Sequence, residues 1–459
     1  MDAGPLTPLL TAKQAFKGTT ETFGETIMTK TILRHAALTA TALAAILPAS
    51  AWASGFYLAE QSAKGTGRAD SGEVADTGTD SLWWNPSAIA GTEGFSSDIN
   101  ASLILPRAKI TDTGTAIAGA YYKGAVGGDS VVSNPIRNGV VPAGAIAYGI
   151  NDKVAVGLAV SAPYNFTTQY PSTAWTRYSA ERTSLRTIDI QPTLAFQPIK
   201  GLRIGVGWNI EHVSATFGNA MPNVSPLLGD GSETLQGKGW DLGVSAGAQW
   251  QAGPLTLGAS YKSAIKHKLD GSITLSGLQT PLSGLNGSYG ASANFTTPWM
   301  AIFGARLAVA PQVTLDVQAT RTGWSKFNAI NLTSAVSSGA IPEGYHDTWT
   351  YAGGADFALS PKTTLRAGVA RDLSPVPNAS RDARVPDSNR WVFALGGSHA
   401  VTSHLTLDAG AQYITLDSAA INRDTGFYLG SPLQTVVATS GEMSGAHVVI
   451  LSLGGRMSF

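Results

Sequence analysis

LRIGVGWNIE, residues 202–211, alternates strictly between two kinds of side chain. The apolar set is Leu202, Ile204, Val206, Trp208 and Ile210, and the small or polar set is Arg203, Gly205, Gly207, Asn209 and Glu211. Because successive side chains of a β-strand point to opposite faces, this period of two predicts a strand with one apolar face. Two architectures fit such a strand: a soluble sandwich with its apolar faces inward, and a membrane barrel with its apolar face toward lipid.

The lengths of the connections decide between these architectures. Fourteen alternating segments can be traced, at 95–110, 142–150, 153–163, 182–197, 201–216, 237–251, 254–270, 293–308, 312–325, 346–359, 362–373, 389–400, 403–417 and 443–459. Long connections (such as 164–181, 217–236 and 374–388) alternate with tight turns (such as 151–152 and 252–253). Outer-membrane barrels have short periplasmic turns and longer external loops. The chain is therefore predicted to be all-β and to form a 14-stranded antiparallel transmembrane β-barrel. Because the number of strands is even, both termini of the barrel are expected on the periplasmic side.

Composition narrows the range of functions. The 459 residues carry 31 basic and 31 acidic side chains, and no cysteine is present. The missing cysteines exclude disulfides and cysteine-ligated metal sites. The neutral charge balance offers no electrostatic footprint for nucleic acid. We expect no cofactor, no bound metal and no nucleic-acid partner.

The start of the chain predicts export. Residues 28–53 combine a short basic region, an apolar stretch and the small-x-small site Ala51-Trp52-Ala53, which is the pattern of a secretory signal peptide. Residues 1–27 precede it and are either an extension or an upstream start artefact. Residues 54–94 lack sustained alternation but contain short apolar patches, which favour a packed segment. They are therefore predicted to plug the lumen of a barrel formed by residues 95–459. The predicted location is the outer membrane of a Gram-negative bacterium.

Aromatic residues support the same orientation. Tryptophans recur where predicted strands meet long loops, which is typical of an interfacial girdle; they are Trp240, Trp299, Trp324, Trp349 and Trp391. The final strand alternates and ends in Phe459. Such an ending resembles the signal that the outer-membrane assembly machinery recognises, and we expect that machinery to be a partner.

Motifs in residues 54–94 resemble a known family. The motifs are Gly55-Phe56-x-Leu58-x-Glu60-Gln61-Ser62-Ala63, Gly65-x-Gly67-Arg68-Ala69, Gly72-Glu73 and Trp84-Asn85-Pro86-Ser87-Ala88. They are similar to the N-terminal hatch of the long-chain fatty acid transporter family, FadL, which includes the aromatic-hydrocarbon porin TodX. A further similar stretch is Arg384-x-Pro386-Asp387-x-x-Arg390-Trp391. Within the hatch, the motif residues singled out are Gly55, Phe56, Gly67, Arg68, Trp84, Asn85 and Pro86.

The resemblance implies uptake of long-chain fatty acids or related hydrophobic compounds across the outer membrane. It also implies capture at an external groove and lateral release through the barrel wall, where the hatch contacts a kink in the third strand. Gly157 lies in the middle of that strand and is the kink candidate, because glycine inside a strand often marks a close backbone approach. We expect Asn85 to hydrogen-bond exposed backbone near Gly157.

Candidate substrate contacts follow from residue type. Apolar residues of two long loops are candidates for the groove: Tyr164, Phe166, Tyr170, Trp175, Phe217, Leu227 and Leu228. Basic residues on predicted lumenal faces are candidates for binding a carboxylate head group: Arg203, Lys262, Arg306 and Arg366. Their other expected role is pairing with lumenal carboxylates such as Asp316 and Asp356.

The sequence is also compatible with two other functions. A general or polar-solute diffusion porin also fits fourteen strands, although such channels need charged residues at a constriction. An outer-membrane lipid enzyme would need a nucleophile and a base. The G-x-S-x-G match at residues 243–247 lies in the middle of a strand rather than at a strand-to-helix turn, so no catalytic residue is predicted. The protein is expected to act as a monomer.

Overall fold

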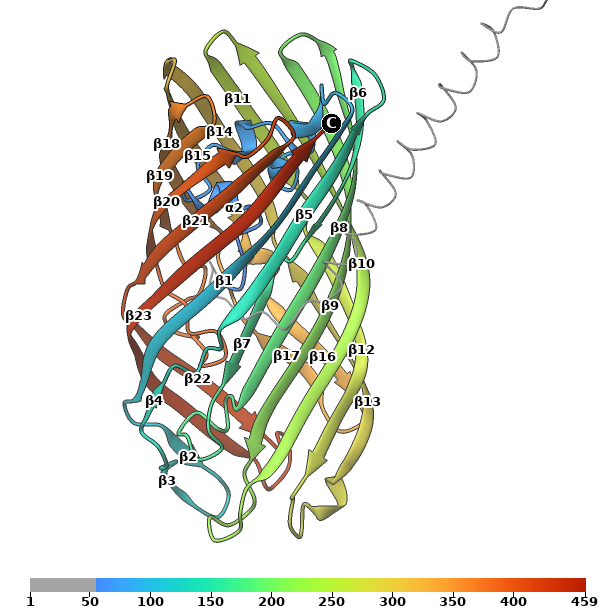
Figure 1. Cartoon of the computed structure of the whole chain (residues 1–459). Helices are drawn as coiled ribbons and strands as arrows, with labels where there is room; N and C mark the ends of the chain where they lie inside the picture. The colour runs from blue at the N-terminus through green and yellow to red at the C-terminus, as the bar shows by residue number, and fades with distance from the viewer. Residues whose placement is uncertain (1–54) are drawn as a thin grey trace, which may run out of the picture. The chain divides into compact units, whose positions relative to one another are not determined.

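A single closed barrel of antiparallel strands accounts for most of the chain (Figure 1). The computed structural model describes residues 55–459, and the predicted signal peptide and the extension before it lie outside these residues. The first long strand pairs with the last, from Ser96 opposite Ser458 to Asp112 opposite Gly441, and this pairing closes the barrel. The prediction of a 14-stranded antiparallel β-barrel is confirmed.

Several of the fourteen wall strands are interrupted, so the wall is built from more than fourteen pieces. The first half contains β1 (Phe95–Asp112), β5 (Gly139–Gly149), β6 (Val154–Ser161), β7 (Asn165–Gln169), β8 (Arg182–Ile199), β9 (Leu202–Met221) and β10 (Gly231–Ala252). The middle contains β11 (Leu255–Lys262), β12 (Ile265–Ser276), β13 (Gly287–Thr297), β14 (Trp299–Ala310), β15 (Val313–Gly323) and β16 (Ala329–Ser334). The remainder contains β17 (Ser338–Pro342), β18 (Thr348–Ser360), β19 (Thr363–Asp372), β20 (Arg390–Ala400), β21 (Leu405–Leu416), β22 (Ala419–Phe427) and β23 (Thr435–Ser458).

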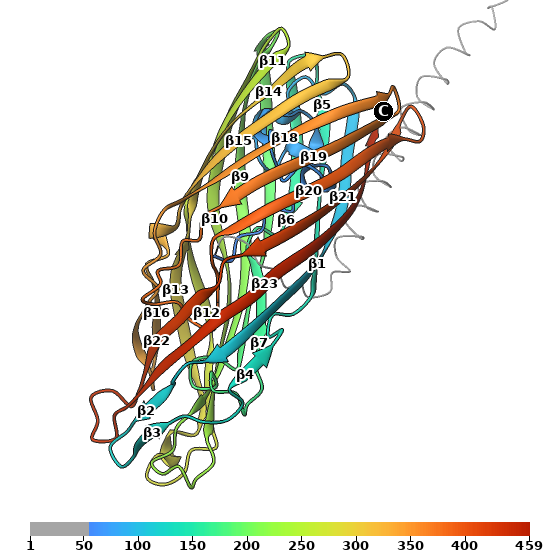
Figure 2. The same cartoon turned by 90° about the vertical axis from the view of Figure 1, so that its left-hand side faces the viewer.

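The two ends of the barrel differ in their connections (Figure 2). One end, here the short-turn end, carries tight turns such as the one between β5 and β6. The other, the long-loop end, carries extended connections that include the short strands β2 (Ala116–Ala118), β3 (Lys123–Ala125) and β4 (Val131–Ser133). The chain's C-terminus lies at the short-turn end.

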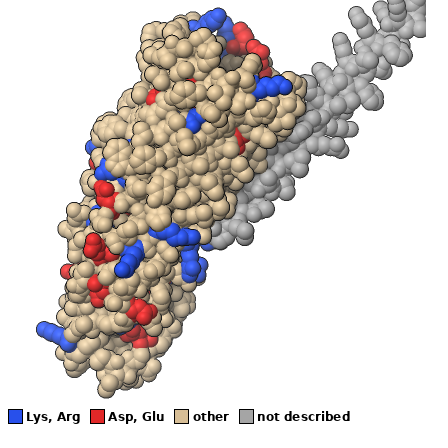
Figure 3. Space-filling view, turned by 60° about the vertical axis from the view of Figure 1, so that its left-hand side comes forward, with Lys and Arg blue, Asp and Glu red and all other residues tan. Residues whose placement is uncertain are grey.

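Alternation along each strand sorts side chains between the outer and inner faces. On β9, Val206 and Trp208 are exposed on the outer face, whereas Gly207 and Asn209 are buried inside. On β15, Val317 points outward and is 57% exposed. On the face shown in Figure 3, a broad band with few charged side chains separates more charged regions. The apolar residues therefore face outward, as a barrel in lipid requires.

The predicted tryptophan girdle needs one correction. Trp240 and Trp391 lie on the outer surface, exposed at the expected level. Trp324 instead begins a short 3₁₀ turn (Trp324–Lys326) that interrupts the wall between β15 and β16, and its side chain is fully buried inside. Alternation could not reveal this inversion, because the turn breaks the period of two.

Residues 55–94, called the N-terminal segment below, lie within the barrel. They form one short helix and three 3₁₀ turns, which are α2 (Ala63–Thr66), η1 (Glu73–Ala75), η2 (Thr79–Ser81) and η3 (Pro86–Ile89). These elements contact strands all round the wall, from β1 and β5 through β9, β10 and β14 to β20 and β21. Nearly all of their side chains are buried. No helix within residues 55–459 is long and apolar enough to cross a membrane.

Candidate functional site

An aromatic cavity opens inside the long-loop end of the barrel. Its volume is about 410 Å³, which is within the usual range for small-molecule sites. Seven aromatic side chains line it: Phe56, Phe166, Phe217, Phe295, Phe327, Tyr345 and Phe427. Residues of β17 and β22 also line the cavity. Each of these two strands pairs with only one neighbour among residues 55–459, β16 and β23 respectively, so the wall there is not continuous.

Phe56 connects the cavity to the N-terminal segment. Its ring packs edge-on against Trp324 and Phe327, with a centroid separation of 4.9 Å in each case. The preceding Gly55 has a positive φ of 65°, and its N–H donates to Asp387 Oδ2 at 2.9 Å. A Cβ at Gly55 would lie 3.1 Å from the Trp324 ring, so glycine suits both the backbone conformation and the space. The start of the N-terminal segment is thereby held among the aromatic side chains of the cavity.

Charged residues gather on one side of the cavity. Arg384 Nε lies 3.5 Å from Asp382 Oδ2, and Arg423 lies 3.7 Å from Asp382 and 3.9 Å from Glu343. Burial raises the pKa of Glu343 to about 7, although the neighbouring Arg423 opposes this rise. The guanidinium group of Arg384 also lies over the Phe217 ring, with its Cζ 5.4 Å from the ring centroid. The cavity thus joins a large apolar surface to polar groups that can orient the end of a ligand.

The predicted groove residues are not all in one place. Phe166 and Phe217 line the cavity, and Tyr164 packs against Phe56 at a centroid distance of 5.7 Å. Tyr170 and Trp175 belong to a separate buried cluster around Leu58. Leu227 is 95% exposed, and Leu228 is also exposed. These last four residues do not line the cavity, because two of them are buried in a different cluster and the other two face outward, so the prediction of one shared substrate groove is wrong for them.

The third wall strand is broken beside the N-terminal segment. β6 ends at Ser161 and β7 begins at Asn165, and the three residues between them leave the ladder. The N-terminal segment pairs with this break: Leu58 N donates to Pro163 O at 2.7 Å, and Asn165 N donates to Phe56 O at 3.2 Å. The wall is incomplete on the other side as well, since β5 pairs with β6 only over residues 144–149.

Gly157 is not where the strand breaks. It pairs in regular register with Ala147 on β5 and Thr193 on β8. A Cβ at Gly157 would lie 2.6 Å from Ile89 Cδ1, so the glycine allows close packing of η3 against the wall. The assignment of the kink to Gly157 is therefore wrong, and the break lies at residues 162–164.

Asn85 also has a different role from the one predicted. Its Oδ1 accepts from Ser87 N at 3.0 Å and caps η3, which Pro86 begins. Its Nδ2 donates to Val74 O at 2.7 Å and to Ala248 O, on β10, at 3.3 Å. Asn85 therefore ties the N-terminal segment to β10, and its predicted hydrogen bond near Gly157 is not formed. Trp84 is buried beside it, and its carbonyl oxygen accepts from Ser260 Oγ.

The four basic residues predicted to bind a carboxylate lie outside the cavity. Arg306 contacts Asp76, Asp316 and Asp356 at 2.8–3.2 Å, and Arg366 contacts Asp356 at 3.3 Å. Lys262 donates to Gln191 Oε1 at 2.8 Å and lies 4.5 Å from the Trp83 ring. Arg203 lies near the short-turn end of β9, opposite Gln249. For Arg306 and Arg366, the alternative role expected from the sequence, pairing with wall carboxylates, is the one observed.

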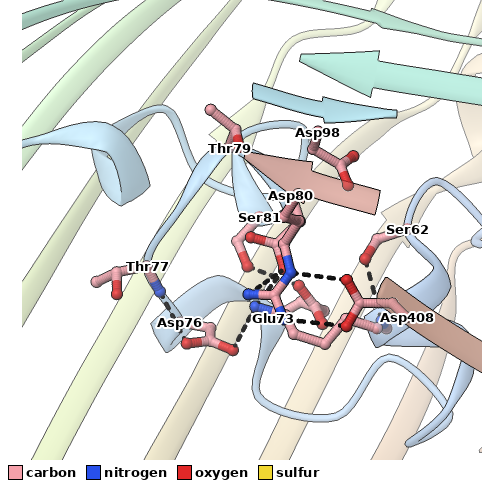
Figure 4. Close-up of polar contacts among 12 residues, drawn as sticks. Ser62, Glu73, Asp76, Thr77, Thr79, Asp80, Ser81, Asp98 and Asp408 are labelled. Carbon is pink, nitrogen blue, oxygen red and sulfur yellow. Dashed lines mark hydrogen bonds and ion pairs between the residues drawn. The ribbon is translucent and has the colours of Figure 1, made fainter. Parts of the chain in front are cut away.

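A buried ionic network fastens the N-terminal segment to the wall (Figure 4). Arg68 is fully buried and contacts Glu73 at 2.6 Å, Asp76 at 2.7 Å and the wall residue Asp356 at 3.2 Å. Lys64 contacts Asp76 at 2.9 Å and Asp80 at 2.5 Å. The neighbouring Gly67 lies against Gly396 of β20, where a Cβ would come within 2.9 Å of backbone. These contacts give structural roles to Gly67 and Arg68, two of the motif residues of the N-terminal segment.

A family model matches residues 44–451 of this chain, and its description is "Outer membrane protein transport protein (OMPP1/FadL/TodX)". The chain belongs to this family. It is 26% identical to the long-chain fatty acid transport protein of Salmonella typhi, over 82% of this chain and 91% of that relative. It is 23% identical to outer membrane protein P1 of Haemophilus influenzae, over 79% of this chain and 86% of that protein.

Solved structures of FadL/TodX-family proteins share the fold. A Pseudomonas aeruginosa FadL homologue superposes with a TM-score of 0.77 at 23% identity, over 88% of this chain and all of that one. The Pseudomonas putida toluene transporter TodX gives 0.62 at 12% identity, over 89% and 100%. This FadL-family protein is thus a β-barrel of the outer membrane.

Two sets of residues at the cavity and the strand break of this FadL-family protein could not be found from the sequence. Arg384 lies within a stretch whose family resemblance was recognised, but nothing in the stretch indicated that its side chain faces a cavity with Arg423. Gln61 was quoted only as part of a motif, although it contacts the strand break directly.

Proposed function

We propose that this protein takes up long-chain fatty acids or related hydrophobic compounds across the outer membrane, without changing them chemically. The aromatic cavity carries the proposal, because each buried CH₂ contributes roughly 0.8 kcal/mol and a long chain needs no charge to bind. The full-length similarity to long-chain fatty acid transport proteins supports the same class of substrate.

In this proposal, the cavity captures the substrate from the long-loop side. The acyl chain lies among Phe166, Phe217 and Phe295, and a polar end group, where one is present, faces Arg384 and Arg423. Guanidinium groups suit a carboxylate because they can donate two parallel hydrogen bonds to it. The arginine–carboxylate distances of 3.5–3.9 Å are long enough for a ligand to compete for these donors.

The N-terminal segment is proposed to act as the plug that keeps polar solutes out. Its burial and its ionic network with the wall support this role, and they count against a general diffusion porin. Release is proposed to occur sideways, through the wall beside the break between β6 and β7. A small space lined by Gln61, Ala143 and Ser161 already lies at this place.

We also propose that the protein works as a monomer and that its last strand is read by the outer-membrane assembly machinery. β23 pairs with β1 on one edge and with β21 on the other, so one chain suffices to close the wall. Phe459 remains 57% exposed at the end of that strand, where another protein can contact it.

Two transport measurements, cellular uptake and liposome swelling, test the proposed function together. Cells that lack their own hydrophobic-compound transporter would receive this gene, and uptake of radiolabelled palmitate, hexadecane and toluene would be compared. Swelling of protein-containing liposomes in sugar solutions tests the alternative that the protein is a general diffusion porin. Uptake of at least one hydrophobic compound without sugar flux is the expected result, and sugar flux without hydrophobic uptake would contradict the proposal.

A further inference from the structure

The outer face of β9, β10 and β12 contains a sharp boundary between apolar and polar side chains. These strands lie next to one another in the wall (Figure 1). On β10, Leu242 and Val244 face outward and are 73% and 53% exposed, and Trp240 follows toward the long-loop end. Beyond Trp240, the outward side chains become polar, beginning with Lys238. Tryptophan at such a boundary is typical of the level of lipid head groups.

Three lysines gather at this boundary. Lys238 stands opposite Asp270 in the pairing of β10 with β12. Lys268 and Lys266 precede Asp270 by two and four residues on the same exposed face of β12. They therefore lie closer to the short-turn end. Because the strands are antiparallel, this places the two lysines beside Trp240 and Leu242. His212 of β9 lies there too, with its ring 4.8 Å from that of Trp240.

The ammonium groups of this lysine cluster (Lys238, Lys266 and Lys268) are not used by the protein itself. None of the three takes part in an ion pair within residues 55–459. Other outward cations near the tryptophans do have such partners: Arg321 lies 3.6 Å from Asp347, and Arg371 lies 3.0 Å from Asp417. The lysine cluster therefore differs from the rest of the boundary.

The nearby acidic groups are too few to neutralise the cluster. Asp270 faces Lys238 across the strands, and Asp241 Oδ2 is already engaged by His267 Nδ1 at 3.2 Å and by the backbone N–H of Lys268 at 3.1 Å. Lysines at the edge of an apolar band extend their ammonium groups toward the head-group layer. A compact, flexible cation of this kind is a common partner for phosphate.

We propose that the lysine cluster binds the phosphate group of a phosphorylated glycolipid in the outer leaflet, with Trp240 and Leu242 against its acyl chains. Three mobile ammonium groups complement a phosphate monoester, while the adjacent apolar side chains exclude a fully soluble anion as the best occupant. The site lies on the outer face of the wall, separate from the aromatic cavity, so it does not depend on the proposed transport function.

The test compares two matched triple variants. One is Lys238→Gln with Lys266→Gln and Lys268→Gln, and the control is Lys153→Gln with Lys200→Gln and Lys362→Gln, which removes the same charge from exposed turns at the short-turn end. Binding of bisphosphorylated lipid A to the purified proteins is measured by native mass spectrometry and by the shift in thermal unfolding. Because each lysine near an anionic surface contributes to attraction, the cluster variant should bind about tenfold more weakly, and the control should match wild type.

Further arms identify the ligand chemistry. Dephosphorylated lipid A should bind wild type as weakly as bisphosphorylated lipid A binds the cluster variant, and inorganic phosphate alone should give no thermal shift. The corresponding triple lysine-to-arginine variant should retain binding, which separates loss of charge from a folding defect. Equal lipid binding by wild type and the cluster variant would overturn the proposal. Equal loss in the control variant, or full reproduction of the effect by inorganic phosphate, would also overturn it.

Discussion

The side-chain amide of Gln61 hydrogen-bonds both backbone polar groups of Ala162 at the break in the third wall strand. Ala162 N donates to Gln61 Oε1 at 3.1 Å, and Gln61 Nε2 donates to Ala162 O at 3.3 Å. A neighbouring strand would normally satisfy these two backbone groups. The N-terminal segment therefore replaces part of the hydrogen bonding between wall strands at the place where lateral release is proposed.

Gln61→Ala should loosen the break without unfolding the barrel. The substitution leaves the buried N–H and C=O of Ala162 without partners, which costs about 1–3 kcal/mol for each unsatisfied group. Hydrogen exchange at residues 162–165 should become faster, and hydrophobic uptake should change. Gln236→Ala, on the exposed outer face of β10, is the control and should alter neither quantity. Unchanged exchange at the break in Gln61→Ala would show that Gln61 does not hold this peptide.

Phe217 and Leu227 should respond differently to truncation, although both were candidates for the groove. Phe217→Ala removes a ring from the cavity, and loss of a buried aromatic contact of this size should weaken palmitate binding by about tenfold or more. Leu227→Ala should leave the affinity unchanged, because its side chain is almost fully exposed. Quenching of tryptophan fluorescence by a brominated fatty acid measures both. Equal losses in the two variants would place the binding site outside the cavity.

Binding of an anionic amphiphile should strengthen as the pH falls through 7. Burial raises the pKa of Glu343 to about 7, so lowering the pH from 8 to 6 neutralises this carboxylate and frees Arg423 to face the ligand. Asp382 and Arg384 are the other charged groups near Glu343. A long-chain alkyl sulfonate is the suitable probe, because its own charge does not titrate over this range.

The matched variant for the pH experiment is Glu343→Gln. It should bind the sulfonate at pH 8 about as tightly as wild type does at pH 6, and it should show no further change with pH. Isothermal titration calorimetry at several pH values measures this. A pH dependence that persists in Glu343→Gln would assign the effect to another group.

Arg68→Ala should open the lumen to ions. Its removal takes the paired arginine from Glu73 and one of several cations from Asp76 and Asp356, which keep Arg306. Breaking the buried pair with Glu73 costs about 3–5 kcal/mol. Steady conductance in planar bilayers should rise, and the N-terminal segment should become sensitive to protease. Arg321→Ala removes an arginine from a partly exposed pair on the outer face and should do neither. A closed Arg68→Ala channel would show that the network is not needed to hold the segment in place.

Local alternation was sufficient to predict the strands, and the lengths of the connections added the barrel. In residues 202–211, the side chains predicted to share a face do so in the structure, because the strand period is a property of consecutive residues. The same reasoning failed for Trp324, since one 3₁₀ turn reverses the direction of the side chain. It failed for Gly157 as well, because a glycine that allows close packing and one that breaks a ladder look alike in a sequence.

The sequence by itself determined the all-β class, the fourteen wall strands and, through motif resemblance, the family. Only the tertiary structure decided which residues meet inside the barrel: Gln61 rather than Asn85 at the strand break, and Arg384 with Arg423 rather than Arg306 and Arg366 at the cavity. Periodicity assigns a side chain to a face but not to a partner. Such partners are brought together by closure of the wall around the N-terminal segment, as when Gly55 meets Asp387, and contacts between residues so far apart in the chain leave no local pattern.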